Sequence, residues 1–144
     1  MKIRYRLLTP SAVSPLKMTE HSAGFDLSAD LSEALVLPPG DRFAVPTGVA
    51  IEIPHGHEAQ IRPRSGLAIK LGLGVLNSPG TIDSDYRGEI KVILFNAGAQ
   101  DIVVQPGMRI AQMVICPVSI CTLEETEQLN ESERAEGGFG HTGH

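Results

Sequence analysis

The chain has 144 residues, of which 42% are hydrophobic, and its formal net charge is −5. This length is typical of one domain that buries a core, and no apolar run approaches the roughly 20 residues needed to span a bilayer. The acidic balance argues against general nucleic-acid binding, because phosphate backbones are held by clustered lysines and arginines. A small phosphorylated ligand is still compatible with it, provided that local cations or a divalent metal offset its charge.

Short strand-like runs recur along the chain and predict an all-β fold. The sequence contains 15 glycines and 10 prolines, several of them at turns between these runs, which is typical of a sandwich or barrel. The expected strands are Ile3–Leu8, Phe25–Ser28, Leu35–Leu37, Asp41–Val45, Gly48–Ile53, Glu58–Arg62, Leu73–Leu76, Gly88–Asn96, Ile102–Val104, Arg109–Pro117 and Ile120–Leu123.

The segment Ala23–Ala29 places the carboxylate of Asp26 among small and apolar residues. An inward carboxylate on a strand needs a cation or hydrogen-bond donors to stay charged. Two interpretations are open: Asp26 serves a bound ligand, or it pairs with an arginine such as Arg64.

Only Ser65–Leu71 has a helical pattern, with Ser65 as the expected N-cap. Arg64, Ser65 and Gly66 stand at its start. Helix N-termini bind phosphate through free N–H groups and the helix dipole, and a glycine lets an oxygen approach the backbone. An ordinary serine cap explains the same residues, so this segment alone does not decide for a phosphate site.

The stretch Asn77–Gly88 is the most informative part of the chain. Alternating apolar residues on both sides predict a tight hairpin. Its tip can present Asn77 to a base edge, Tyr86 to a sugar and Asp83 to a water. The alternative is a surface hairpin whose Asp and Gly residues only satisfy turn geometry.

The long strand expected at Arg109–Pro117 alternates so that Arg109, Ala111 and Met113 share one face. Gln112 then lies on the other face, among apolar neighbours. A buried amide needs a partner, and an internal hydrogen bond explains this position as well as contact with a ligand does.

The two cysteines, Cys116 and Cys121, have a spacing that matches no common zinc or redox motif. The N-terminus has no apolar core of a secretion signal. We therefore expect buried free thiols in a reducing cytoplasm.

The C-terminal part differs from the rest in composition. Residues 124–136 are acidic and polar, and residues 137–144 are rich in glycine and contain Phe139. A glycine-rich end is most often disordered, but an aromatic among glycines also suits a mobile lid over a ligand. We expect one domain, with a barrel over residues 1–123 and an acidic linker with a glycine-rich lid over residues 124–144.

Together these segments resemble the five hallmark motifs of the trimeric dUTP pyrophosphatases (dUTPases), in the order of that family. The resemblance implies a distorted jelly-roll β-barrel with one short helix and a flexible C-terminal tail. It also implies a cytoplasmic homotrimer with shared active sites, without stable nucleic-acid or membrane binding. Its activity would be Mg²⁺-dependent hydrolysis of dUTP to dUMP and pyrophosphate, which lowers dUTP and supplies dUMP for thymidylate synthesis. The motifs are Ala23–Ala29, Pro63–Lys70, Asn77–Val92, Arg109–Ile115 and Arg134–Gly143.

The resemblance also implies a role for each site residue. Asp83 resembles the carboxylate that orients and deprotonates the attacking water, and Tyr86 resembles the ring that packs on the deoxyribose. Asp26 matches the carboxylate that acts near Mg²⁺ through water, while the phosphates hold most of the metal. Asn77, Thr81, Ile82 and Lys91 resemble the uracil-binding elements, Arg64, Ser65, Gly66 and Gln112 the phosphate binders, and Arg134, Phe139, Gly140 and His141 the lid.

Two other functions remain open. A dCTP deaminase of the same superfamily needs a proton-shuttling glutamate at the base, and the only glutamate of the hairpin, Glu89, lies past its tip. A nucleotide-sensing binding protein without turnover would not need both Asp83 and Asp26.

Overall fold

The computed structural model describes residues 1–132 and 135–137, and within them strands dominate. The one helix has the predicted bounds. The elements are β1 (Arg4–Leu7), β2 (Gly24–Ser28), β3 (Leu35–Leu37), β4 (Arg42–Pro46), β5 (Val49–Glu52), β6 (His57–Arg62), α1 (Ser65–Leu71), β7 (Leu73–Val75), β8 (Gly80–Ile82), β9 (Lys91–Asn96), β10 (Ile102–Val104) and β11 (Arg109–Pro117).

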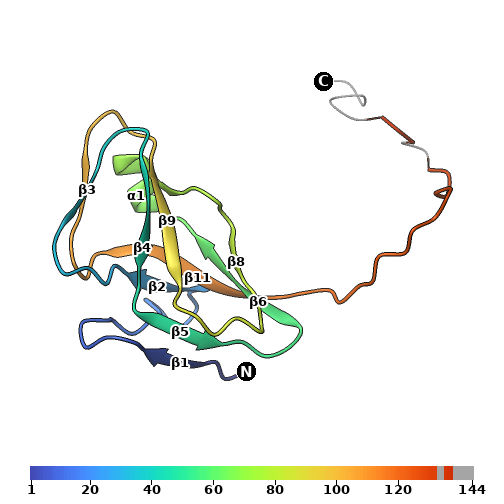
Figure 1. The fold of residues 1–144 in the computed structure, drawn as a ribbon, viewed down its shortest axis with the longest axis horizontal. Coiled ribbons are helices and arrows are strands. Elements are labelled where there is room, and N and C mark those ends of the chain that lie inside the picture. The colour runs from blue at the N-terminus through green and yellow to red at the C-terminus, as the bar shows by residue number, and fades with distance from the viewer. Residues whose placement is uncertain (133–134, 138–144) are drawn as a thin grey trace.

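The strands form small antiparallel sheets that wrap around one core (Figure 1). The largest sheet has the order β2-β11-β6-β8, and a second has the order β4-β9-β7; β1 pairs with β5 and β3 with β10. Neighbours in a sheet are far apart in sequence, as expected of a jelly-roll. The predicted all-β barrel with one short helix is confirmed. No helix among the described residues has the length and apolar character needed to cross a bilayer.

Alternate side chains of the strands that face the core are buried in it. In β9, for example, Val92, Leu94 and Asn96 are buried while the residues between them are not. The amide of Asn96 fits an apolar core because its Nδ2 donates to Leu37 O and Gln100 O, both at 2.8 Å. A buried polar group with its hydrogen bonds made costs little stability and fixes its neighbours.

The N-cap of α1 differs from the expectation. It is Arg64, in extended conformation and without a side-chain cap hydrogen bond, so the predicted cap at Ser65 is wrong. The C-cap is Gly72, whose φ of 70° lies in the left-handed region that favours glycine.

The stretch Asn77–Gly88 is not the tight hairpin that was predicted. The strands on its two sides, β7 and β9, do pair, but the stretch between them contains β8, which pairs with β6 in the other sheet. The predicted strand Gly88–Asn96 is also shorter and begins at Lys91. The strand β8 has only three residues and lies inside a turn-like sequence. Such a short segment does not show an alternating pattern that could be recognised.

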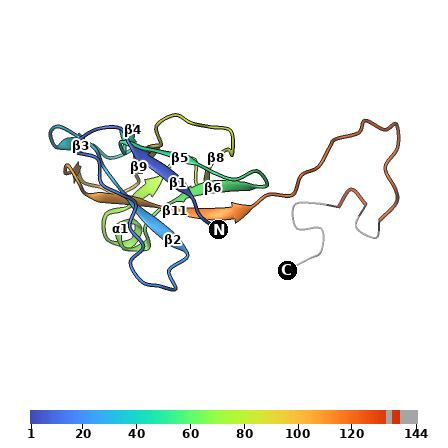
Figure 2. The ribbon, with the colours of Figure 1, turned by 90° about the horizontal axis from the view of Figure 1, so that it is seen from below.

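The predicted strand Ile120–Leu123 is wrong. Residues 118–132 leave the end of β11 as extended, exposed chain, which runs away from the barrel in both views (Figures 1 and 2). Their apolar residues have no sheet of the same chain to pair with. Both cysteines are free thiols, but Cys116 is only half-buried and Cys121 is exposed, contrary to the predicted burial.

Candidate functional site

A first group of polar side chains gathers where β2, β11 and the start of α1 meet. Asp26 on β2 is paired in register with Gln112 on β11, so both project from the same face. Arg64 Nη2 lies 3.3 Å and Arg109 Nη1 3.0 Å from Asp26 Oδ2. Because the side chain of Asp26 is only 12% exposed, these two cations offset the cost of burying its charge. The pairing with Arg64, one of the two interpretations open for Asp26, is present.

Backbone carbonyls hold the same group in place. Arg64 Nη1 donates to Arg109 O at 2.9 Å, and Gln112 Nε2 donates to Pro63 O at 3.0 Å. The internal hydrogen bond that was one of the two options for Gln112 is therefore present. Gly24 allows the close packing, because a Cβ there would lie 2.8 Å from Gln112 Oε1.

Arg109 belongs to this group although strict alternation placed it on the other face. A β-bulge between Arg109 and Ala111 pairs Arg109 with Ser28 and Ala111 with Leu27. The extra residue moves Arg109 onto the face of Asp26 and leaves Ala111 in the core. A pattern of period two contains no signal for such a bulge, so sequence reasoning missed this residue.

Ser65 and Gly66 form the exposed first turn of α1, directly after Arg64. A Cβ added at Gly66 would meet nothing within 4 Å, so packing of the barrel does not require glycine there. The open space over its backbone suits the close approach of a ligand oxygen.

A second group lines a cavity of about 300 Å³ between β8, β9 and the loop that joins them. Asp83 and Tyr86 come from the loop, and Lys91 begins β9. The loop side of the cavity is polar, and the strands contribute both apolar and polar side chains. Its lining residues are Ala44, Thr81, Ile82, Asp83, Tyr86, Glu89, Lys91 and Ile93.

A smaller cavity of about 90 Å³ adjoins it, shares Thr81, Ile82, Lys91 and Ile93, and is also lined by Asn77. The strand β8 stands at the edge of its sheet and pairs only with β6. Its second edge therefore carries backbone N–H and C=O groups that no strand of the described chain takes up.

The loop after β8 is fixed near its end. Tyr86 Oη donates to Glu89 O at 2.9 Å, and its ring lies where any side chain at Gly88 would collide with it. Glu89 Oε1 accepts from Gly48 N at 2.9 Å. Glu89 lies before β9, not on a strand as predicted, and its place in the cavity was missed because its partner is 41 residues away.

Asp83 lies at the border between two hollows. It lines the 300 Å³ cavity on one side and, on the other, a cavity of about 530 Å³ shared with His57 and Asp85. Its side chain is exposed, so its carboxylate is accessible to water and to a ligand.

The first group extends from β2 across β11 to the residues that follow β6, and the second lies around β8. The strands of Asp26 and of the second group, β2 and β8, are the opposite edges of the β2-β11-β6-β8 sheet, which three interstrand steps of about 4.8 Å make about 14 Å wide. Of the lid residues, Arg134, Phe139, Gly140 and His141 lie outside the described residues. Ala135, which is described, has a φ of 44°.

The donor set was tested for a metal site. Among the described residues, no cluster of three or more His, Cys, Asp or Glu side chains could hold a metal ion. Both ion pairs of Asp26 use Oδ2, and neither uses Oδ1. These residues fit a metal ion held mainly by a phosphorylated ligand and reached by Asp26 through water.

Comparison with known proteins gives one family. The family model described as dUTPase matches residues 11–143. The chain is 52% identical over 141 residues to a deoxyuridine 5'-triphosphate nucleotidohydrolase of Syntrophotalea carbinolica. The matched region covers 98% of this chain and 96% of the relative.

Solved structures give the same result. The dUTPase of Staphylococcus bacteriophage 80alpha with dUPNHPP superposes with a TM-score of 0.85, at 27% identity, over 99% of this chain and 98% of its own. A dUTPase of Staphylococcus aureus phage phi11, whose structure is described for a structural Mg(II) ion, has a TM-score of 0.82 at 24% identity, over 91% of this chain and 100% of its own, and shares the fold. The chain belongs to the dUTPase family.

Proposed function

We propose that this chain is a dUTP diphosphatase, which hydrolyses dUTP to dUMP and pyrophosphate. The observation that carries the proposal is the cavity in which Asp83 and Tyr86 lie beside the free edge of β8, in a chain of the dUTPase family. The S. carbinolica relative is named for the same reaction, and the 80alpha structure contains a dUTP analogue.

The uracil ring is proposed to enter the hollow beside β8. Backbone N–H and C=O groups of Thr81 and Ile82 can pair with O4 and N3–H of uracil, and Asn77 and Lys91 line the same space. A cytosine presents the reversed donor pattern and would leave these groups unpaired. The cavity of about 90 Å³ also leaves little room for the methyl group of thymine.

The deoxyribose is proposed to pack on Tyr86. The hydrogen bond from its hydroxyl to Glu89 O and the absence of a side chain at Gly88 hold the ring in one place. A fixed ring against C2′ leaves no space for a 2′-hydroxyl, so UTP would be rejected.

The phosphates are proposed to bind the group at the start of α1. Arg64 supplies charge and bidentate geometry, while Ser65, Gly66 and Gln112 supply hydrogen-bond donors. Mg²⁺, held mainly by the phosphates with Asp26 in contact through water, would neutralise their charge when bound. Arg109 joins Arg64 beside Asp26, so we add it to the residues that place this carboxylate.

In the proposed reaction Asp83 accepts a proton from a water that attacks the α-phosphorus in line with the leaving group. The new bond joins the water oxygen to Pα, and the bond from Pα to the bridging oxygen of the β-phosphate breaks. Pyrophosphate leaves with the electron pair. A positioned general base of this kind contributes about 10²–10⁴-fold, and positioning of the triphosphate contributes much of the rest.

We propose a homotrimer with shared sites, the assembly that the family resemblance implies, and the separation of Asp26 and Asp83 within one chain supports the sharing of sites. Asp26 on β2 and Asp83 after β8 belong to opposite edges of one sheet, yet one nucleotide with its metal must reach both. Two chains that bring unlike edges together satisfy this requirement. We propose that Arg134, Phe139, Gly140 and His141 close the site as a lid, at the end of the linker that begins at residue 124.

Assays of pyrophosphate release from dUTP, and of ammonia release from dCTP, test the proposal. We expect pyrophosphate from dUTP and no ammonia. Ammonia would indicate a dCTP deaminase. That reaction needs a glutamate that shuttles protons at the base, whereas the carboxylate of Glu89 accepts a hydrogen bond from the N–H of Gly48. Tight binding of dUTP without either product would indicate a nucleotide-sensing protein.

A further inference from the structure

Arg87 is in contact with the loop that carries Asp83 and Tyr86. Its Nη1 donates to Ser84 O at 2.7 Å and to Tyr86 O at 2.9 Å. One guanidinium nitrogen thus bridges two carbonyls on either side of Asp85.

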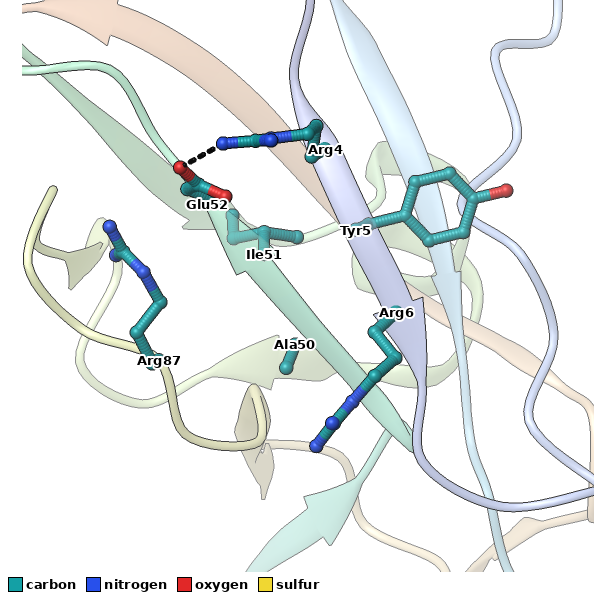
Figure 3. A pocket seen from close by; sticks show the side chains of 7 residues that line it. All are labelled: Arg4, Tyr5, Arg6, Ala50, Ile51, Glu52 and Arg87. Carbon is teal, nitrogen blue, oxygen red and sulfur yellow. Dashed lines mark hydrogen bonds and ion pairs between the residues drawn. The ribbon is translucent and has the colours of Figure 1, made fainter.

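The outer side of Arg87 faces a cavity of about 350 Å³ beside β1 and β5 (Figure 3). Arg4 and Arg6 line the same cavity, and its single carboxylate, Glu52, is taken by Arg4 at 2.6 Å. Within residues 1–132 and 135–137, no ion pair involves Arg87. The contacts of this side chain are therefore directed to the loop and not to a carboxylate.

The loop has two other backbone supports. Tyr86 N donates to Asp83 O across the same turn, at the long distance of 3.2 Å, and Glu89 fastens the end of the loop to Gly48. Between these points the residues are mostly exposed. A charged donor that binds both carbonyls fixes the curvature of the turn, and with it the direction of the carboxylate and the ring.

We propose that Arg87 is a positioning residue of the reaction: it holds the turn 84–86 so that Asp83 and Tyr86 keep their relative placement. This inference rests on the proposed function. Arg87 does not touch the nucleotide; it acts through the two residues that do. Misplacement of a reacting group by about 1 Å can cost about 10²-fold in rate.

The test compares Arg87→Met with Arg6→Met, which removes a guanidinium from the same cavity but from β1. For Arg87→Met we expect kcat with dUTP to fall by about 10–100-fold, while KM changes little because the phosphate binders lie on α1 and β11. The preference for dUTP over UTP should also fall, because the backbone of Tyr86 loses the contact from Arg87 to its carbonyl. Arg87→Lys keeps a charged donor and should recover part of both losses. Arg6→Met should resemble the unsubstituted protein.

The thermal midpoint is measured for each variant. Unchanged kcat and unchanged dUTP preference in Arg87→Met would overturn the inference. A lower midpoint with an unchanged dUTP preference would overturn it too, because the role would then be structural. If the unsubstituted protein releases no pyrophosphate from dUTP, the proposed function itself fails, which is a separate result.

Discussion

At the scale of single residues, the proposed base gives the most direct prediction. Asp83→Asn keeps the shape of the side chain but cannot accept a proton from water. We expect kcat for pyrophosphate release to fall by about 10²–10⁴-fold, while a non-hydrolysable dUTP analogue still binds with similar affinity by calorimetry. A variant that retains its rate would remove Asp83 from this role.

The ring of Tyr86 gives the second prediction. Tyr86→Ala should allow measurable hydrolysis of UTP, because the surface that excludes a 2′-hydroxyl is lost. Tyr86→Phe is the control: it loses the hydrogen bond to Glu89 O but keeps the ring over Gly88, so most of the selectivity should remain. The ratio of kcat/KM for dUTP to kcat/KM for UTP measures the sugar selectivity of both variants. If Tyr86→Ala still rejects UTP, sugar selection lies elsewhere.

Sequence reasoning at this scale worked where chemistry is carried by residue type. A carboxylate in a small-residue strand indicated that Asp26 needs a cation, and Arg64, which one of the two open interpretations named, is paired with it. It failed where a contact between residues far apart in sequence decides the position of a side chain. Arg109 reaches Asp26 only because of a bulge, and Glu89 meets Gly48 across the fold.

At the scale of elements, turn residues and apolar alternation predicted the order of nearly all strands. Local patterns could not predict β8, because its three residues form a strand only by pairing with β6. They also could not exclude a strand at Ile120–Leu123, since alternation does not tell whether a partner strand exists. Strand pairing depends on the whole fold, so only the structure could show that β8 is a strand and that Ile120–Leu123 is not.

The helix α1 gives a prediction at this scale. Gly72→Ala should destabilise the protein by about 1–2 kcal/mol, because φ at Gly72 is positive. An added Cβ would also meet Gly98 N at 2.6 Å. Gly66→Ala, at the other end of the same helix, has open space and should leave stability equal or slightly higher. Urea unfolding compares the two, and equal losses would mean that neither the backbone angle nor the contact at Gly72 matters.

At the scale of the whole molecule, the exposed chain after β11 and the placement of the two polar groups around different strands of one sheet are the features on which the proposed lid and shared sites depend. The core, by contrast, is closed by its own strands. Deleting residues 136–144 should therefore leave the thermal midpoint nearly unchanged while lowering activity, if these residues form the lid. Full activity without them would exclude that role.

Mixing of two inactive variants tests whether active sites are shared between chains. Asp83→Asn damages the group beside β8, and Arg64→Ala damages the group beside β2, at the other edge of the same sheet. If each site takes one group from each of two chains, refolding the variants together should restore activity in roughly a quarter of the sites, since some sites then combine the two intact groups. Each variant refolded alone is the control and should stay inactive. A mixture as inactive as its parents, or a monomer by light scattering, would contradict sites shared between chains and would mean that both groups act within one chain.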